Sequence, residues 1–157
     1  NMVEELKKLY NIEEFDNAKT KVLKYILFKK RTEKEVRQKF SSSLDENLLE
    51  DVIENLKENG YIDDQNYIER AVKEFLAIKT MSIKEMKSKL YTKGVESDKI
   101  ETYFMEHEEE LQQYEISCAK KIILKRQLQM SQEEIEAFLY KKGYSREMVR
   151  TAKEELN

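Results

Sequence analysis

This chain has one histidine and one cysteine, two residue types that often serve as catalytic groups or transition-metal ligands. His107 stands in the acidic run EHEEE, but a zinc site needs several nitrogen or sulfur ligands at suitable spacing. Cys118 could be a nucleophile, but no histidine lies near it in the sequence to act as its base. It follows that His107 is best interpreted as part of an acidic surface helix. We interpret Cys118, beside Ala119, as a core residue.

Adjacent aspartates and phosphate-binding loops are equally scarce. Asp63 and Asp64 are the only adjacent aspartates and could bind a cation, but Asp64 as the N-cap of a helix explains the pair more simply. Three glycines spread over 157 residues cannot form a glycine-rich phosphate loop. We therefore predict no catalytic residue, metal, cofactor or small-molecule substrate, and we expect that the protein is not an enzyme.

The composition predicts a helical, cytoplasmic protein. There is no proline and there are three glycines, which are the main helix-breaking residues. The apolar residues, 39% of the chain, are periodic along it. No apolar run approaches the ~20 residues of a membrane span, and one cysteine cannot form an internal disulfide, which indicates a reducing compartment. Asn1 before Met2 indicates either an added residue or a natural N-terminus that lies upstream.

One short pattern occurs three times. TEKEV at residues 32–36, SIKEM at 82–86 and SQEEI at 131–135 each have a hydroxyl residue, a glutamate three positions later and then an apolar residue. This is a capping box, in which the hydroxyl and the glutamate satisfy backbone amides at a helix start. The spacings are 50 and 49 residues, so we predict an internal repeat.

A second pattern follows the second and third boxes. LYTKGV at residues 90–95 aligns with LYKKGY at 139–144, whereas the first copy reads FSSSL at 40–44 and has no glycine. Glycine tolerates the left-handed conformation that commonly ends a helix. We therefore interpret Gly94 and Gly143 as helix stops rather than as part of a ligand site.

Each repeat is predicted to hold three helices. In the first repeat they span residues 17–30, 33–40 and 45–59, and the first of them carries a stripe of Ala18, Val22, Ile26 and Leu27. We expect Asp45, Ser97 and Ser145 to be the N-caps of the third helices.

The predicted fold is all-α, with three tandem three-helix repeats that are helix-turn-helix-like and form an elongated curved rod. The predicted parts are an N-terminal helical extension at 1–16, repeat 1 at 17–60, repeat 2 at 61–110 and repeat 3 at 111–157.

The net charge of −3 hides a segregation of charge along the chain. Residues 17–40 are strongly basic, residues 116–130 are basic without an acid, and acidic stretches lie between them. Most single charges on such a chain are solvated surface, but blocks of one sign indicate partner contacts. The predicted partner- or DNA-binding cations are Lys24, Lys29, Lys30, Arg31, Arg37 and Lys39, with Lys120, Lys121, Lys125 and Arg126 as a second region.

The ordered motifs resemble the RecX family of bacterial recombination regulators. GYIDD at residues 60–64 followed by Tyr67 and Ala71, KRTEKEV at 30–36 and LYTKGV at 90–95 are similar to that family's segments, over residues 17–157. Thr80 and Met81 stand where many relatives have a glycine-containing turn. The resemblance implies a non-enzymatic modulator that lies along the RecA–DNA filament and suppresses the ATPase, strand exchange and co-protease activity of RecA. It thereby implies a role in DNA recombination, repair and the SOS response.

Two alternatives remain open from the residues alone. One is a helix-turn-helix-like module that binds single- or double-stranded DNA without RecA, with an affinity that falls steeply as salt rises. Its basic stretch is poor in rings for stacking, with Tyr25 and Phe28 as the candidates. The other alternative is a helical-repeat adaptor for a different protein.

Overall fold

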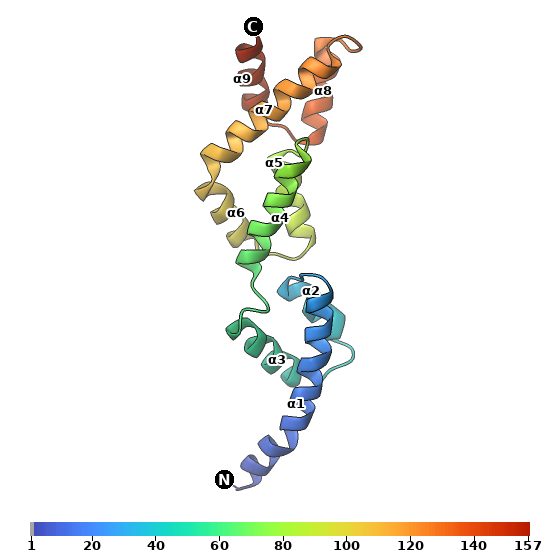
Figure 1. Ribbon diagram of the computed structural model, residues 1–157, viewed down its shortest axis with the longest axis vertical. Coiled ribbons are helices and arrows are strands. Elements are labelled where there is room, and N and C mark those ends of the chain that lie inside the picture. The colour runs from blue at the N-terminus through green and yellow to red at the C-terminus, as the bar shows by residue number, and fades with distance from the viewer. Residues whose placement is uncertain (1) are drawn as a thin grey trace. The chain divides into compact units, whose positions relative to one another are not determined.

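A computed structural model describes the backbone of residues 2–157 and the side chains from residue 12 onward. Figure 1 shows the helices in chain order. Over residues 2–157 there are nine helices and no strand, which confirms the prediction of an all-α fold. Their bounds are α1 Met2–Phe28, α2 Glu33–Phe40, α3 Glu46–Glu58, α4 Asp64–Ile78, α5 Ile83–Thr92, α6 Ser97–Glu106, α7 Glu108–Arg126, α8 Gln132–Lys142 and α9 Arg146–Leu156.

The helices follow the predicted order of three per repeat, and they divide into two compact units. Unit 1 holds the described residues up to Tyr67 together with Lys93–Val95, and unit 2 holds Ile68–Thr92 and Glu96–Asn157. The predicted extension, residues 1–16, is helical from residue 2 and continues into the first helix of repeat 1 without a break. Side chains 1–11 lie outside the described residues. The repeat boundaries at 17–60, 61–110 and 111–157 remain a prediction.

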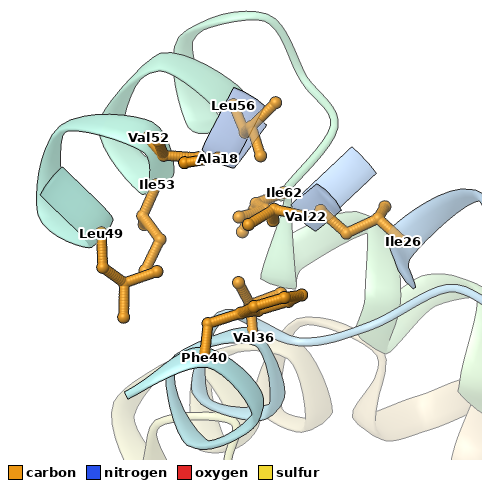
Figure 2. Close-up of a cluster of buried hydrophobic side chains, with 10 residues drawn as sticks. All are labelled: Ala18, Val22, Ile26, Val36, Phe40, Leu49, Val52, Ile53, Leu56 and Ile62. Atoms are coloured by element: carbon orange, nitrogen blue, oxygen red, sulfur yellow. The ribbon is translucent and has the colours of Figure 1, made fainter. Parts of the chain in front are cut away.

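The core of unit 1 is built from apolar stripes on three helices (Figure 2). The stripe of α1 is close to the predicted one, but Leu27 is exposed and that assignment was wrong. Nine residues separate Leu27 from Ala18, about two and a half helical turns, so the two side chains lie on opposite faces. The buried residues are Ala18, Val22 and Ile26 of α1, Val36 and Phe40 of α2, Leu49, Val52, Ile53 and Leu56 of α3, and Ile62.

Unit 2 has its own core, in which Cys118 is buried as predicted. One cluster joins the last three helices, while α4, α5 and α6 bury residues such as Ile68, Met86 and Ile100. The cluster comprises Ile116, Cys118, Ala119 and Ile122 of α7, Ile135 and Leu139 of α8, Tyr144, and Met148, Val149 and Ala152 of α9.

The caps follow the sequence pattern with two exceptions. Complete capping boxes form at Thr32 and Ser131, and the Asp45 and Ser145 side chains accept hydrogen bonds from the first turns of α3 and α9. Ser97 is the first residue of α6 and not its N-cap. Glu96 takes that position without a side-chain hydrogen bond, so the Ser97 prediction was wrong.

The second exception concerns the aspartate pair. The Asp63 carboxylate accepts from the Asn66 amide and so caps α4, at 3.1 Å. The predicted cap, Asp64, lies inside the helix, and its Oδ1 accepts from the Glu33 amide of α2 at 3.0 Å. Asp63 therefore caps α4, the helix that follows it, whereas Asp64 caps the start of α2.

Candidate partner-binding surfaces

The start of α2 is held by residues that follow it by 31 and 61 positions. Thr32 is completely buried, and its Oγ1 accepts from the Glu35 amide and donates to the Lys93 carbonyl at 2.6 Å. With Asp64 on the Glu33 amide, two amides of the first turn have side-chain acceptors. Such amides have no partner within their own helix.

The start of α5 repeats this arrangement inside unit 2. Ser82 is completely buried, and its Oγ accepts from the Glu85 amide and donates to the Lys142 carbonyl at 2.7 Å. Glu115 takes the place of Asp64, because its Oε1 accepts from the Ile83 amide at 3.0 Å. Of the two bonds of the box predicted at Ser82, the described residues show the one from the Glu85 amide to the hydroxyl. The Thr32 and Ser82 helix starts each rest on a lysine-glycine turn.

The contacts of these two lysine-glycine turns explain why the second and third repeats have a glycine there. Gly94 and Gly143 have φ of +88° and +102°, in the left-handed region. A Cβ on Gly94 would lie 2.4 Å from Lys34 Cδ, and one on Gly143 would lie 2.7 Å from Ser82 Oγ. The third box, at Ser131, is exposed, and the first-copy turn at residues 40–44 has no glycine.

Burial of Glu115 has a consequence for stability. The side chain is 2% exposed, and burial raises the pKa of this carboxyl. A raised pKa means that the folded protein favours the protonated carboxyl. The contribution of Glu115 to stability is therefore full at low pH and is lost as pH rises through the raised pKa. Glutamine would keep an acceptor for the Ile83 amide without a charge.

We therefore expect Glu115→Gln to raise the free energy of unfolding at pH 8, and we expect the gain to shrink as pH falls through the raised pKa and to be gone below the usual carboxyl range. Urea unfolding at several pH values measures this difference. Glu147→Gln, an exposed change on α9, is the matched control and should stay close to the wild type. A Glu115→Gln variant less stable than the wild type at pH 8 would contradict the expectation.

The first predicted basic cluster divides into engaged and free cations. Arg37 donates to both oxygens of Glu50, at 2.6 and 3.0 Å, and to Glu33 at 3.1 Å. Its hydrogen bond to Glu50 raises the pKa of Arg37 and lowers the pKa of Glu50. Arg31 lies over the Tyr25 ring at 4.1 Å, and Lys30 bonds to Asn66. The exposed members of the cluster are Lys24, Lys29 and Lys39, and the Lys39 ammonium lies 5.8 Å from the centre of the same Tyr25 ring.

The second predicted region divides in the same way. Lys120 pairs with Glu155 at 3.3 Å, and the guanidinium of Arg126 lies 4.1 Å from the centre of the Phe138 ring. Lys121 and Lys125 are exposed, and neither has a carboxylate partner among the described side chains.

Both groups of exposed lysines have exposed apolar neighbours. Phe28, which the sequence analysis named only as a ring for stacking on DNA, is 87% exposed next to Lys29. Leu128, which it did not select, is 91% exposed three residues after Lys125. Leu27 and Leu124 are exposed as well. The available signal was helical phase, because Leu27 is out of register with the buried stripe. We define surface 1 as Leu27, Phe28 and Lys29, and surface 2 as Leu124, Lys125 and Leu128.

The described part of the chain can also be compared with two further kinds of feature, metal sites and membrane-spanning helices. No group of three His, Cys, Asp or Glu side chains there could hold a metal. His107 lies between α6 and α7, so its assignment to a helix was wrong. It stacks on Tyr103, with ring centroids 4.1 Å apart, and its Nδ1 lies 2.8 Å from the Tyr103 carbonyl oxygen. None of the described helices is long and apolar enough to cross a bilayer.

No family model matches the chain, but curated proteins do. "Regulatory protein RecX" of Staphylococcus haemolyticus is 31% identical over 156 residues, which cover 94% of this chain and 58% of that protein. "Regulatory protein RecX" of Streptococcus mutans serotype c is 28% identical over 159 residues, 98% of this chain and 61% of that protein. The chain thus spans about three fifths of the length of these relatives.

Solved structures share the fold. The crystal structure of RecX from Lactobacillus salivarius superposes with a TM-score of 0.79 at 24% identity, over 92% of this chain and 97% of that one. A second one, "Crystal structure of regulatory protein RecX", gives a TM-score of 0.79 at 20% identity, over 95% of this chain and 77% of that one. The solved structures show that the fold is shared, and the similarity to the curated relatives places the chain in the RecX family of regulatory proteins.

Proposed function

We propose that this protein is a non-enzymatic, cytoplasmic regulator that binds the RecA–DNA filament and inhibits the ATPase, strand-exchange and co-protease activities of RecA. One observation supports a protein as the binding partner: on surfaces 1 and 2, exposed apolar side chains lie next to exposed lysines. The RecX family resemblance supplies RecA as the partner.

The two surfaces have the composition of a protein interface. Interfaces owe most of their binding energy to a few large side chains that become fully desolvated, while charges around them steer association. Phe28 and Leu128 are large, and their apolar area is in water in the free protein. A partner that recognised phosphate alone would need the lysines and would gain nothing from these two side chains.

A filament is a suitable partner for a chain with two such surfaces. It presents the same subunit many times, so each surface can contact a subunit. Linked contacts raise the overall affinity above that of either contact alone. Lys24, Lys29, Lys39, Lys121 and Lys125 are the cations that we assign to direct contact. Arg31, Arg37, Lys120 and Arg126 have partners within the protein, and Lys30 bonds to Asn66.

Co-sedimentation with RecA filaments on single-stranded DNA tests this proposal. We expect the protein to pellet with the filament and to be released partly as salt rises, because part of the attraction is between exposed charges. RecA without DNA and DNA without RecA are the two controls. A protein that pellets to the same extent with DNA alone as with the filament would contradict a RecA-dependent contact and favour the helix-turn-helix-like alternative.

A further inference from the structure

A groove in unit 2 that neither predicted basic region includes combines cations with aromatic rings. It lies between α5 and α8 and has a volume of about 620 Å³. Lys84 and Ser88 of α5 line it, and Phe138, Tyr140, Lys141 and Lys142 of α8 line it as well. The glycine that follows α8, Gly143, also lies at the groove, so the docking of the lysine-glycine turn on Ser82 sets its shape.

The lysines of the groove lack the carboxylate partner that several other cations of this protein have. Arg37, Lys57, Lys120 and Lys153 each pair with a carboxylate. Among the described side chains, Lys84, Lys141 and Lys142 have no such partner. Glu85 is the one acidic residue among those that line the groove. The groove therefore carries excess positive charge that the protein itself does not neutralise.

Cations lie over two aromatic rings of the groove. The Arg126 guanidinium lies 4.1 Å from the Phe138 ring centre, and the Lys142 ammonium lies 5.7 Å from it. Arg146 lies 4.7 Å from the Tyr140 ring centre. Planar guanidinium groups on rings extend the stacking surface, and bases stack on both aromatic and guanidinium planes.

We propose that this groove binds single-stranded nucleic acid, with Lys84, Lys141 and Lys142 on the phosphates and bases stacked against Phe138 and Tyr140. Grooves that track a charged backbone and offer rings to successive bases are the usual way to hold a single strand. Bases in a duplex are already stacked on one another, so a duplex would not use the rings. An acidic peptide would use the lysines but would leave the rings without a role.

Anisotropy of a fluorescent 15-nucleotide oligothymidylate, measured with no RecA present, tests the groove independently of the proposed function. We expect Lys84→Gln/Lys141→Gln/Lys142→Gln to weaken binding about tenfold or more at low salt and to reduce the salt slope by about 2. Lys21→Gln/Lys73→Gln/Lys99→Gln removes the same charge from exposed positions outside the groove and should bind like the wild type. Equal affinity of the two triple variants would overturn the proposal.

An abasic oligonucleotide of equal length isolates the contribution of the rings, since it keeps the phosphates and lacks the bases. We expect the wild type to bind it about tenfold more weakly than oligothymidylate, and Phe138→Leu to reduce that difference. Circular dichroism establishes that each variant is folded. Equal binding of both probes by the wild type would show a groove for anions alone and would overturn the assignment to single strands. Loss of DNA binding in the groove variant with unchanged co-sedimentation on RecA filaments would separate the two proposals and support this one.

Discussion

Replacing Gly143 with alanine is expected to destabilise the protein by about 3 kcal/mol. Two costs combine at this position. The left-handed φ of +102° strains any residue with a Cβ, and the new Cβ would lie 2.7 Å from Ser82 Oγ. That hydroxyl is buried, donates to the Lys142 carbonyl and accepts from the Glu85 amide, so it cannot move aside without losing both bonds.

The other two glycines are graded controls for this effect. Gly60 has a φ of +78°, and no atom lies within 4 Å of the position that a Cβ would take, so Gly60→Ala should cost only the backbone strain, about 1 kcal/mol. Gly94 faces the long side chain of Lys34, which is exposed and can move, so its alanine variant should fall between the two. Urea denaturation followed by circular dichroism gives the order. Equal losses at Gly60 and Gly143 would show that the contact with Ser82 adds nothing.

A double variant, Phe28→Ser/Leu128→Ser, is expected to lose at least about 30-fold in inhibition of RecA without losing stability. Both side chains are almost fully exposed, so their removal takes no apolar area out of the core. If they are the anchors of surfaces 1 and 2, the two truncations together should cost about 2 kcal/mol or more of binding, which corresponds to about 30-fold. Titration of the variant into a RecA ATPase assay measures the loss.

Met105→Ser supplies the matched control for this double variant. Met105 is 69% exposed on α6 and belongs to neither surface, so its replacement should leave inhibition unchanged. A double variant that inhibits as well as Met105→Ser would contradict the assignment of the two surfaces.

Much of the fold was predictable because it depends on local sequence patterns. Buried stripes follow the helical period, and capping boxes depend on residues three positions apart. The absence of proline left the helices unbroken. Leu27 shows where this kind of prediction fails. It directly follows the buried Ile26 in the sequence, yet its side chain is exposed.

The docked turns were harder to predict, since each joins residues about 60 positions apart. The sequence marks Gly94 and Gly143 as helix stops, and they are, but their contacts with Lys34 and Ser82 depend on how the repeats pack. The same packing places the Asp64 carboxylate on the Glu33 amide, so that it caps α2 and not its own helix. A local pattern cannot distinguish these two roles of an aspartate.

For a related reason, the sequence could not show which cations of the predicted basic regions have partners within the protein. Counting charges along the chain selects basic segments, but pairing depends on neighbours in space. Arg37 lies in the most basic segment and is held by Glu33 and Glu50, whereas Lys84 and Lys141 lie outside both segments and stay without a carboxylate partner among the described side chains.

The measurement that tests the central claim most directly is the ATPase rate of RecA on single-stranded DNA, with this protein titrated in at two salt concentrations. We predict inhibition at or below a one-to-one ratio to RecA at low salt and weaker inhibition at high salt, because the exposed lysines of surfaces 1 and 2 contribute through screened charges. An unchanged ATPase rate in large excess of folded protein would contradict the account.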